Sequence, residues 1–378
     1  MHLTAALATL VLVVPVLGVP TRVPITKRAG PVKLNSFLVT FKDAASKNAY
    51  MRTGPSFTDS LSRIDHDYTI INGFAATILS TKDLDSIRGT AGVQSVEPDG
   101  IVSINYEIGL DGFDPVGYKA IAESETREKR TDTGGKGEGT RVIGIDTGIY
   151  TEHNCFGGRA SWGPQINKDY EQKDGNGHGT RRLIIYSDTA GSAVVLGDDG
   201  SGTTSDVIMG VQQACKIYKS DQVPSVVTMS LGGAPNTGLD DAVKNCIGEG
   251  LHFSIAAGNS MLPADTSSPA RVKEANTIGA VDYGNKQASF SNFGSLIDVW
   301  YYGVNVKSAW IDGPDSTNVL SGTSMATPGI AGILVAAISN HRQKSPADLS
   351  EDLKNNALPV VQLTTGAVTS NDLLATRW

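Results

Sequence analysis

The chain has 378 residues, of which 40% are hydrophobic and 19% are charged, and its formal net charge is -7 at pH 7. This length allows a large buried core and predicts two or three domains. The negative charge argues against a nucleic-acid partner, because phosphate contacts need clustered positive charge.

Residues 1–20 form an apolar segment that contains Pro15 and ends in small residues. The segment is short for a membrane span and has the pattern of a secretory signal peptide, although no Lys or Arg precedes its apolar part. A membrane anchor is the alternative interpretation. No other stretch is long and apolar enough to span a bilayer. We therefore expect a secreted, extracellular protein that makes no membrane contact after signal removal.

The chain has three cysteines, Cys155, Cys215 and Cys246. An oxidising compartment permits one disulfide and leaves one thiol over. All three pairings remain open. No CxxC pair occurs, which argues against a structural zinc site.

The region that follows the signal alternates between extended and helical patterns. A β-α-β-α-β order within roughly 80 residues predicts a small α+β domain with an antiparallel sheet, which we place at residues 21–102. The expected elements are a strand at 36–41, a helix over 43–64, an extended segment at 68–79, a helix at 81–88 capped by Thr81, a strand at 93–96 and a turn at 97–100.

Residues 103–140 are polar, charged and glycine-rich near their end, so we expect a linker there that leads into the mature chain. Buried-type strands and amphipathic helices then alternate over residues 141–378, which predicts an α/β domain with a parallel sheet covered by helices on both faces. The expected strands are 142–145, 226–229 and 251–257, and the expected helices are 203–219, 239–247 and 325–340.

Sites in parallel sheets gather at the carboxyl ends of the strands, and polar residues lie where such ends are expected. Asp146 directly follows the first strand, His178 lies in a glycine-rich turn, and Ser324 stands between small residues before a long apolar helix. A serine hydroxyl needs a base to attack an amide, an imidazole can serve as that base, and a buried carboxylate orients the imidazole. Taken singly, each residue also fits an ordinary turn or helix cap.

Asn259 follows the strand at 251–257 and completes the set. Its side-chain amide could donate to an oxyanion together with the backbone N–H of Ser324, an interaction worth roughly 3–4 kcal/mol in the transition state.

The four residues occur in Asp-Thr-Gly, His-Gly-Thr, Ala-Ala-Gly-Asn and Gly-Thr-Ser-Met-Ala-Thr-Pro, in that order along the chain. This set resembles the subtilisin-like serine proteases, above all the secreted fungal branch that resembles proteinase K. The likeness runs from about 141 to 358, and residues 36–101 resemble the family's inhibitory propeptide, a ferredoxin-like domain. The resemblance implies a monomeric zymogen that hydrolyses extended polypeptides through an acyl-enzyme. Its propeptide would assist folding, occupy the cleft and be removed by the enzyme itself.

The same resemblance assigns further residues. It implies no cofactor for catalysis, and a structural calcium ion at Asp298, although calcium usually has six to eight oxygen ligands. The strand edges that would pair with substrate are Gly200, Ser201, Gly202, Ser230, Leu231, Gly232 and Gly233, and the apolar primary pocket would be lined by Ala256, Ala257 and Gly258.

Other enzyme classes fit less well. Asp-Thr-Gly also marks aspartic proteases, but its two copies, at Asp132 and Asp146, are too close in sequence to lie on separate lobes. The Gly-x-Ser-x-Gly motif of α/β-hydrolases is absent around Ser324.

One segment departs from the family. After His178 the family continues into a buried helix of small residues, whereas this chain has Arg181 and Arg182 and a shorter segment up to Val194. Unpaired charges are costly to bury, and a displaced base loses activity. The alternative interpretation is a catalytically impaired relative, or a mis-spliced product.

Overall fold

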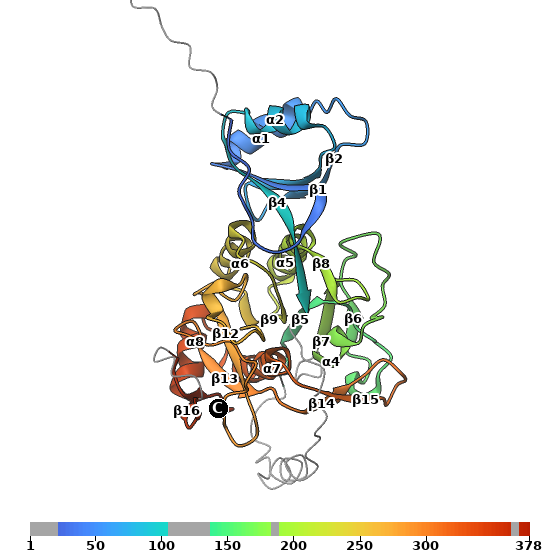
Figure 1. Ribbon diagram of the computed structural model, residues 1–378. Coiled ribbons are helices and arrows are strands. Elements are labelled where there is room, and N and C mark those ends of the chain that lie inside the picture. The colour runs from blue at the N-terminus through green and yellow to red at the C-terminus, as the bar shows by residue number, and fades with distance from the viewer. Residues whose placement is uncertain (1–21, 105–136, 183–188, 364–369) are drawn as a thin grey trace, which may run out of the picture.

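The computed structural model describes residues 22–104, 137–182, 189–363 and 370–378. The expected signal peptide and most of the expected linker lie outside these ranges. The described chain forms a small α/β domain and a larger one, and strand β4 reaches from the first into the second (Figure 1).

The small domain is a four-stranded antiparallel sheet in the order β4-β1-β3-β2, with both helices on the face away from the larger domain (Figure 1). Its core includes Val39, Phe74, Ile87 and Val96. The elements are β1 (Val32–Phe41), α1 (Ala44–Thr53), β2 (Arg63–Tyr68), β3 (Gly73–Thr77), α2 (Thr81–Arg88) and β4 (Val93–Ile104).

Four local expectations for this domain were wrong. The first helix ends at Thr53 and not at residue 64, because Gly54 adopts φ 71° and Pro55 follows it. The expected extended segment at 68–79 is a hairpin of β2 and β3. A glycine is needed at its turn, since a Cβ on Gly73 would lie 2.6 Å from the Val39 carbonyl oxygen.

The second helix is capped one residue earlier than expected. The Ser80 side chain accepts a hydrogen bond from the backbone N–H of Asp83, so Ser80, and not Thr81, is the N-cap.

The expected turn at 97–100 is also wrong, because β4 runs straight through these residues. Their backbone pairs with β1, and two of their side chains bind residues at the N-termini of helices in the larger domain. Asp99 is fully buried and accepts from the Ser205 N–H at 3.0 Å and the Ser205 hydroxyl at 2.6 Å. Glu97 accepts from the side chain of Asn236 at 2.9 Å. Burial raises the pKa of Asp99, against the hydrogen bonds from Ser205 and Ser36 that lower it.

The larger domain is built on a nine-stranded sheet in the order β16-β17-β13-β12-β11-β9-β5-β7-β6. Every neighbouring pair is parallel except β16 with β17. The strands are β5 (Arg141–Asp146), β6 (Ala160–Trp162), β7 (Thr189–Val194), β9 (Ser225–Met229), β11 (His252–Ala256), β12 (Asn276–Val281), β13 (Val299–Tyr302), β16 (Leu358–Pro359) and β17 (Leu373–Leu374).

Helices cover both faces of this sheet, as expected. Alternate residues of one strand enter different cores: Ile143 packs with α5 and α6, whereas Val142 packs with α7 and α8. The helices are α4 (His178–Arg182), α5 (Thr204–Asp221), α6 (Thr237–Gly248), α7 (Thr323–His341) and α8 (Pro346–Asn355), with short 3-10 turns at Asn154–Phe156 and Ala264–Thr266. The remaining strands are β8 (Ser201–Thr203), β10 (Leu231–Gly232), β14 (Val306–Ala309) and β15 (Thr317–Leu320).

Among the described residues, α7 has the length and apolar composition of a membrane span. However, 78% of its most apolar window is buried inside the protein. Its apolar sequence is therefore accounted for by its place in the core.

The Asp99 contacts predict a loss of stability when this carboxylate is removed. In the full chain, Asp99→Ala leaves the Ser205 N–H and two buried hydroxyls without their acceptor, and we expect the free energy of unfolding to fall by about 2–3 kcal/mol. Chemical unfolding measures this loss. The matched control, Asp372→Ala at an exposed aspartate, should change the value by less than about 0.5 kcal/mol. An equal change in both variants would contradict the role of Asp99.

Candidate active site

Asp146 and His178 form a buried hydrogen-bonded pair at the carboxyl edge of the sheet. Asp146 is the last residue of β5, and His178 is the first residue of α4. His178 Nδ1 lies 2.7 Å from Asp146 Oδ1, and the two side chains are only 1% and 3% exposed. A carboxylate at this distance favours the tautomer with the proton on Nδ1, in which Nε2 carries the lone pair and can act as a base.

Asp174 fixes the turn that leads into α4. Its buried carboxylate accepts from the Gly177 N–H at 2.7 Å, and from the N–H and hydroxyl of Thr180 at 2.7 and 2.6 Å. It also accepts from the hydroxyl of Thr147, directly after β5, at 2.9 Å. One side chain thus ties the residues before and after His178 to the end of the strand that carries its partner.

Two features of the segment after His178 that differ from the family pattern have a structural explanation. Arg181 is buried, but its Nη2 donates to the Val306 carbonyl at 3.0 Å, and its guanidinium lies 5.7 Å from the ring centre of Trp310. These contacts compensate the buried charge, through a hydrogen bond and a cation–π interaction. Thr189–Val194 form β7, which pairs with β5. The core strand expected before Gly200 is therefore present, and residues 183–188 lie outside the described ranges.

Ser324 is the second residue of α7, at the same edge of the sheet. Its hydroxyl donates to the backbone carbonyl of Ser230 at 3.3 Å, and Ser230 directly follows β9. Helix α7 also contacts β5 and α4, which carry Asp146 and His178. The N–H groups in the first turn of a helix have no intrahelical acceptor and favour negative charge nearby. The serine therefore lies where an alkoxide or oxyanion would be stabilised.

Asn259 lies beside the start of α7 in a fixed orientation. Its Oδ1 accepts from the N–H and the hydroxyl of Thr323 at 2.9 and 2.8 Å. Its Nδ2 is buried and has no hydrogen-bond partner within the described part of the chain. A buried unpaired donor costs about 1–3 kcal/mol. An acceptor placed beside Nδ2, such as an oxyanion, would remove this cost.

Asn292 supports Asn259 from a distant part of the sequence. Its Oδ1 accepts from the N–H groups of Ser260 and Leu262, both at 3.0 Å, and its Nδ2 donates to the Ala257 carbonyl at 2.8 Å. These bonds fix the loop that carries Asn259.

Sequence reasoning selected neither Asn292 nor two other supporting residues, Asp174 and Thr323. The latter two lie inside the motifs of His178 and Ser324, where a polar side chain beside a catalytic residue was the available signal. Asn292 had no such local signal.

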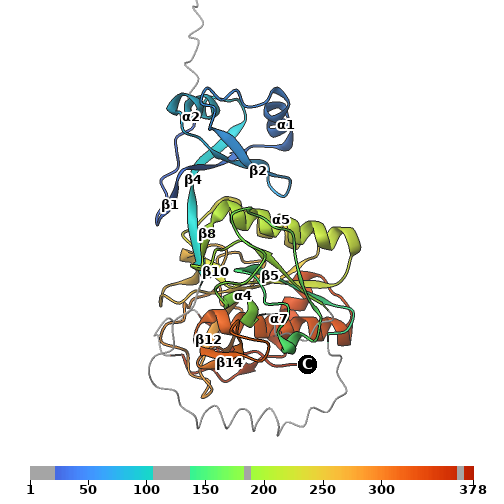
Figure 2. The ribbon, with the colours of Figure 1, turned by 90° about the vertical axis from the view of Figure 1, so that its right-hand side faces the viewer.

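The end of β4 lies between β8 and β10, at the edge of the larger domain (Figure 2). It pairs antiparallel with both strands, and the Ile104 N–H donates to the Gly200 carbonyl at 3.0 Å. An extended peptide is thus held through its backbone on both sides, which is β-augmentation. The register pairs are Ile101 with Thr203, Val102 with Gly202, Ser103 with Ser201 and Gly232, and Ile104 with Leu231.

The structure brings the predicted substrate-contacting residues to this edge. Gly200 to Gly202 and Ser230 to Gly233 flank β4 on its two sides. Ala256 ends β11, and Ala257 and Gly258 lead from it to Asn259. The role of these three residues as a primary pocket stays a prediction.

Asp298, the residue expected to bind calcium, has two contacts within the protein. One carboxylate oxygen accepts from the Thr277 N–H at 2.9 Å, and the other lies 3.2 Å from the Lys354 ammonium. Burial raises the pKa of Asp298, whereas the Thr277 hydrogen bond and Lys354 lower it. A cation already neutralises this carboxylate. No group of three or more His, Cys, Asp or Glu side chains in the described ranges could hold a metal ion. Calcium binding stays an untested prediction.

Comparison with known families decides which family the chain belongs to. The model of the subtilase family, Peptidase S8, matches residues 137–374, and that of peptidase inhibitor I9 matches residues 35–105. The chain belongs to the subtilase family. The small domain is the I9 domain, here called the propeptide domain, and the larger one is the subtilase domain.

Named relatives agree with this assignment. Subtilisin-like protease 2 of Pseudogymnoascus destructans is 34% identical over 86% of this chain and 85% of that relative. Alkaline protease 2 of Aspergillus fumigatus is 35% identical over 76% of this chain and 63% of its own length. The crystal structure of a cold adapted subtilisin-like serine proteinase superimposes with a TM-score of 0.58 at 35% identity, over 64% of this chain and 89% of that one.

The Asp174 hydrogen bonds predict a loss of activity when one carboxylate oxygen is replaced by an amide. In Asp174→Asn the NH₂ group cannot accept a hydrogen bond. The N–H of either Gly177 or Thr180 therefore loses its acceptor, and the turn that carries His178 is held less firmly. We expect labelling of the subtilase by a fluorophosphonate to slow by about 10- to 100-fold, since small misplacements of a base have effects of this size. Asp169→Asn, at an exposed aspartate on the same loop, should label at the original rate. Equal rates for both folded variants would contradict the prediction.

Proposed function

We propose that this subtilase is a serine endopeptidase that cleaves extended polypeptides, with Ser324 as nucleophile, His178 as base and Asp146 as its orienting carboxylate. The observation that carries the proposal is the peptide strand at the end of β4. It pairs with β8 and β10 and reaches Leu231. The preceding residue, Ser230, accepts a hydrogen bond from the Ser324 hydroxyl through its backbone carbonyl. A peptide in this position presents its next bonds to the nucleophile.

The reaction follows from these positions. Ser324 Oγ attacks the peptide carbonyl carbon while His178 Nε2 takes the hydroxyl proton. The tetrahedral oxyanion accepts hydrogen bonds from Asn259 Nδ2 and the Ser324 N–H. The C–N bond then breaks, and His178 gives the proton to the leaving amine. Water enters, His178 deprotonates it, and the ester to Ser324 is hydrolysed.

The side chains of the bound strand support an apolar substrate preference. Val102 and Ile104 alternate with Ser103, so they point to the same side of the strand. Val102 is buried, and the Ile104 Cδ1 atom fills the space beside Gly200. We expect substrates with apolar residues at these two alternate positions to be cleaved fastest.

The propeptide domain would act as an intramolecular inhibitor. Its strand fills the peptide-binding edges, Asp99 accepts from the Ser205 N–H in the first turn of α5, and Glu97 accepts from Asn236, the N-cap of α6. A further contact pairs His66 Nε2 with Asp206 Oδ1 at 2.7 Å. Burial raises the pKa of Asp206, but its hydrogen bonds with His66 and Asn167 outweigh this and lower it. We propose a secreted zymogen that becomes active when this domain leaves.

Labelling with a fluorophosphonate tests the nucleophile. We expect the processed chain to be labelled at Ser324, and peptide mass mapping identifies the modified residue. Ser324→Ala should abolish labelling, and Asn259→Ala should lower kcat by about 10²- to 10³-fold, the magnitude measured for such a donor in subtilisin. A control at an exposed serine, Ser220→Ala, should label normally. Absence of labelling in a folded, processed chain would leave a non-catalytic subtilase as the conclusion.

The register of β4 also predicts the maturation bond. Ile104 pairs with Leu231, so the next position along the antiparallel register is opposite Ser230, which contacts Ser324. We therefore expect self-cleavage between Asn105 and Tyr106, two residues outside the described ranges. Sequencing the N-terminus of the mature chain tests this.

Two outcomes would contradict self-cleavage at this bond. One is a mature N-terminus directly after Lys129-Arg130. The other is normal processing of Ser324→Ala when it is expressed alone, which would assign maturation to another protease. The expected result is an uncleaved Ser324→Ala chain, with full cleavage of the Ser220→Ala control.

A further inference from the structure

Two of the three cysteines meet between α5 and α6. Cys215 lies on α5 and Cys246 on α6; they are 2% and 0% exposed and belong to the same core cluster. The two helices pack against each other, and each thiol shifts the pKa of the other. The third cysteine, Cys155, packs in the core on the opposite face of the sheet. The three pairings that the sequence left open are thus reduced to one by the fold.

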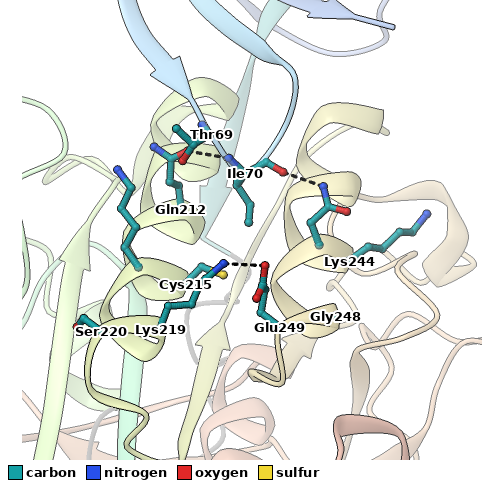
Figure 3. Close-up of a pocket in the computed structure, with 11 residues that line it drawn as sticks. Thr69, Ile70, Gln212, Cys215, Lys219, Ser220, Lys244, Gly248 and Glu249 are labelled. Atoms are coloured by element: carbon teal, nitrogen blue, oxygen red, sulfur yellow. Dashed lines mark hydrogen bonds and ion pairs between the residues drawn. The ribbon is translucent and has the colours of Figure 1, made fainter. Parts of the chain in front are cut away.

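A pocket of about 660 Å³ opens onto this pair (Figure 3). It lies between the two helices, below the propeptide residues Thr69 and Ile70, and Cys215 lines it. Figure 3 shows the Cys215 sulfur on the side of α5 that faces α6. Cys246 is absent from the lining, so a reagent in the pocket meets Cys215 first. The other lining residues are Gln212, Lys216, Lys219, Ser220, Lys244, Asn245, Gly248 and Glu249.

The two thiols have different electrostatic environments. The neighbouring Cys246 thiol lowers the pKa of Cys215, against the effect of burial. Burial raises the pKa of Cys246 well above its ordinary value. Lys216, Lys219 and Lys244 line the pocket, where their positive charge suits an anionic reagent. Lys219 also lowers the pKa of Cys215, whereas Glu249, its ion-pair partner, raises it. Cys215, which lines the pocket, is therefore the thiol expected to attack a reagent. Cys246 is expected to attack the mixed disulfide that results.

We propose that Cys215 and Cys246 form a redox site that closes to a disulfide across α5 and α6, with Cys215 as the entry thiol reached through the pocket. The oxidant is a small-molecule disulfide with carboxylate groups, such as glutathione disulfide, whose charge suits the three lysines. This proposal does not depend on the peptidase activity.

The exchange takes two balanced steps. The Cys215 thiolate attacks one sulfur of glutathione disulfide, a mixed disulfide forms, and one glutathione thiolate leaves. The Cys246 thiolate then attacks the Cys215 sulfur, and the second glutathione thiolate leaves. Cys215 and Cys246 lose two electrons and two protons in total, and one glutathione disulfide accepts them and becomes two glutathione molecules.

The disulfide would join the two helices on which the propeptide domain rests. Thr69 and Ile70 donate their N–H groups to Gln212 of α5, and Asn245 of α6 donates to the Ile70 carbonyl at 2.7 Å. When the propeptide leaves, these bridging contacts are lost. The remaining cross-link near the pair is the Lys219–Glu249 ion pair at 2.8 Å, whose side chains are about half exposed and which therefore contributes little. A disulfide would hold the helices together in the mature enzyme.

The experiment uses the full-length Ser324→Ala chain, so that the propeptide domain stays attached. The folded protein is equilibrated with glutathione disulfide at graded ratios to glutathione, alkylated, and mapped by mass spectrometry without reduction. We expect the alkylated thiols to fall from three to one, with Cys215 linked to Cys246 and Cys155 alkylated. We also expect the melting temperature to rise by about 5–10 °C on oxidation.

Variants separate the steps. Cys155→Ser should still form the cross-link, and Cys246→Ser should stop at the mixed disulfide of Cys215 with glutathione. Three alkylated thiols at every ratio, or a cross-link that includes Cys155, would overturn the proposal. Should Cys246→Ser fail to fold, the map of the parent chain decides between these results.

Discussion

The parallel pairing of β5 with its two neighbours is the constraint on which the site depends. Asp146 is opposite Val194 of β7, and Ile145 is opposite Met229 of β9, so the strands end at one edge. The loops that leave this edge carry Ser230 and the start of α4. Helix α7 packs against β5 and β9, and its first turn brings Ser324 to this edge. Hydrogen bonds of Asp174 fix the turn that carries His178. Hydrogen bonds of Thr323 and Asn292 fix Asn259 and its loop.

One strand links the two domains of the zymogen. β4 belongs to the propeptide sheet through β1, and its end belongs to the subtilase edges through β8 and β10. Between these parts, Glu97 and Asp99 place two carboxylates at helix N-termini, where the aligned peptide dipoles favour negative charge. These polar contacts lie beside apolar ones, since Leu38, Tyr68 and Ile71 of the propeptide domain share a core cluster with α5 and α6.

Two unusual features are local solutions to packing. Arg181 stands close to His178 where the family resemblance implies a small residue, and the Trp310 ring and the Val306 carbonyl accommodate its charge. The Cys215–Cys246 contact places two thiols where α5 and α6 meet, below the propeptide loop. In both places the partner comes from a distant segment of the chain. The residues next to Arg181 or Cys215 in sequence do not reveal that partner.

The sequence by itself determined the fold class, the family resemblance and all four proposed catalytic residues, because strand periodicity and short motifs are local properties. It also located the two edges that hold a peptide. It misjudged the turn at 97–100, since the preference of Glu-Pro-Asp-Gly for turns is overridden by pairing with β1 and by the helix N-termini that its carboxylates cap. Only the tertiary structure decided the support given by Asn292, the burial of Arg181, the lysine beside Asp298 and the pairing of Cys215 with Cys246. Each of these depends on contacts between segments far apart in the chain, and such contacts leave no periodic signal in the sequence.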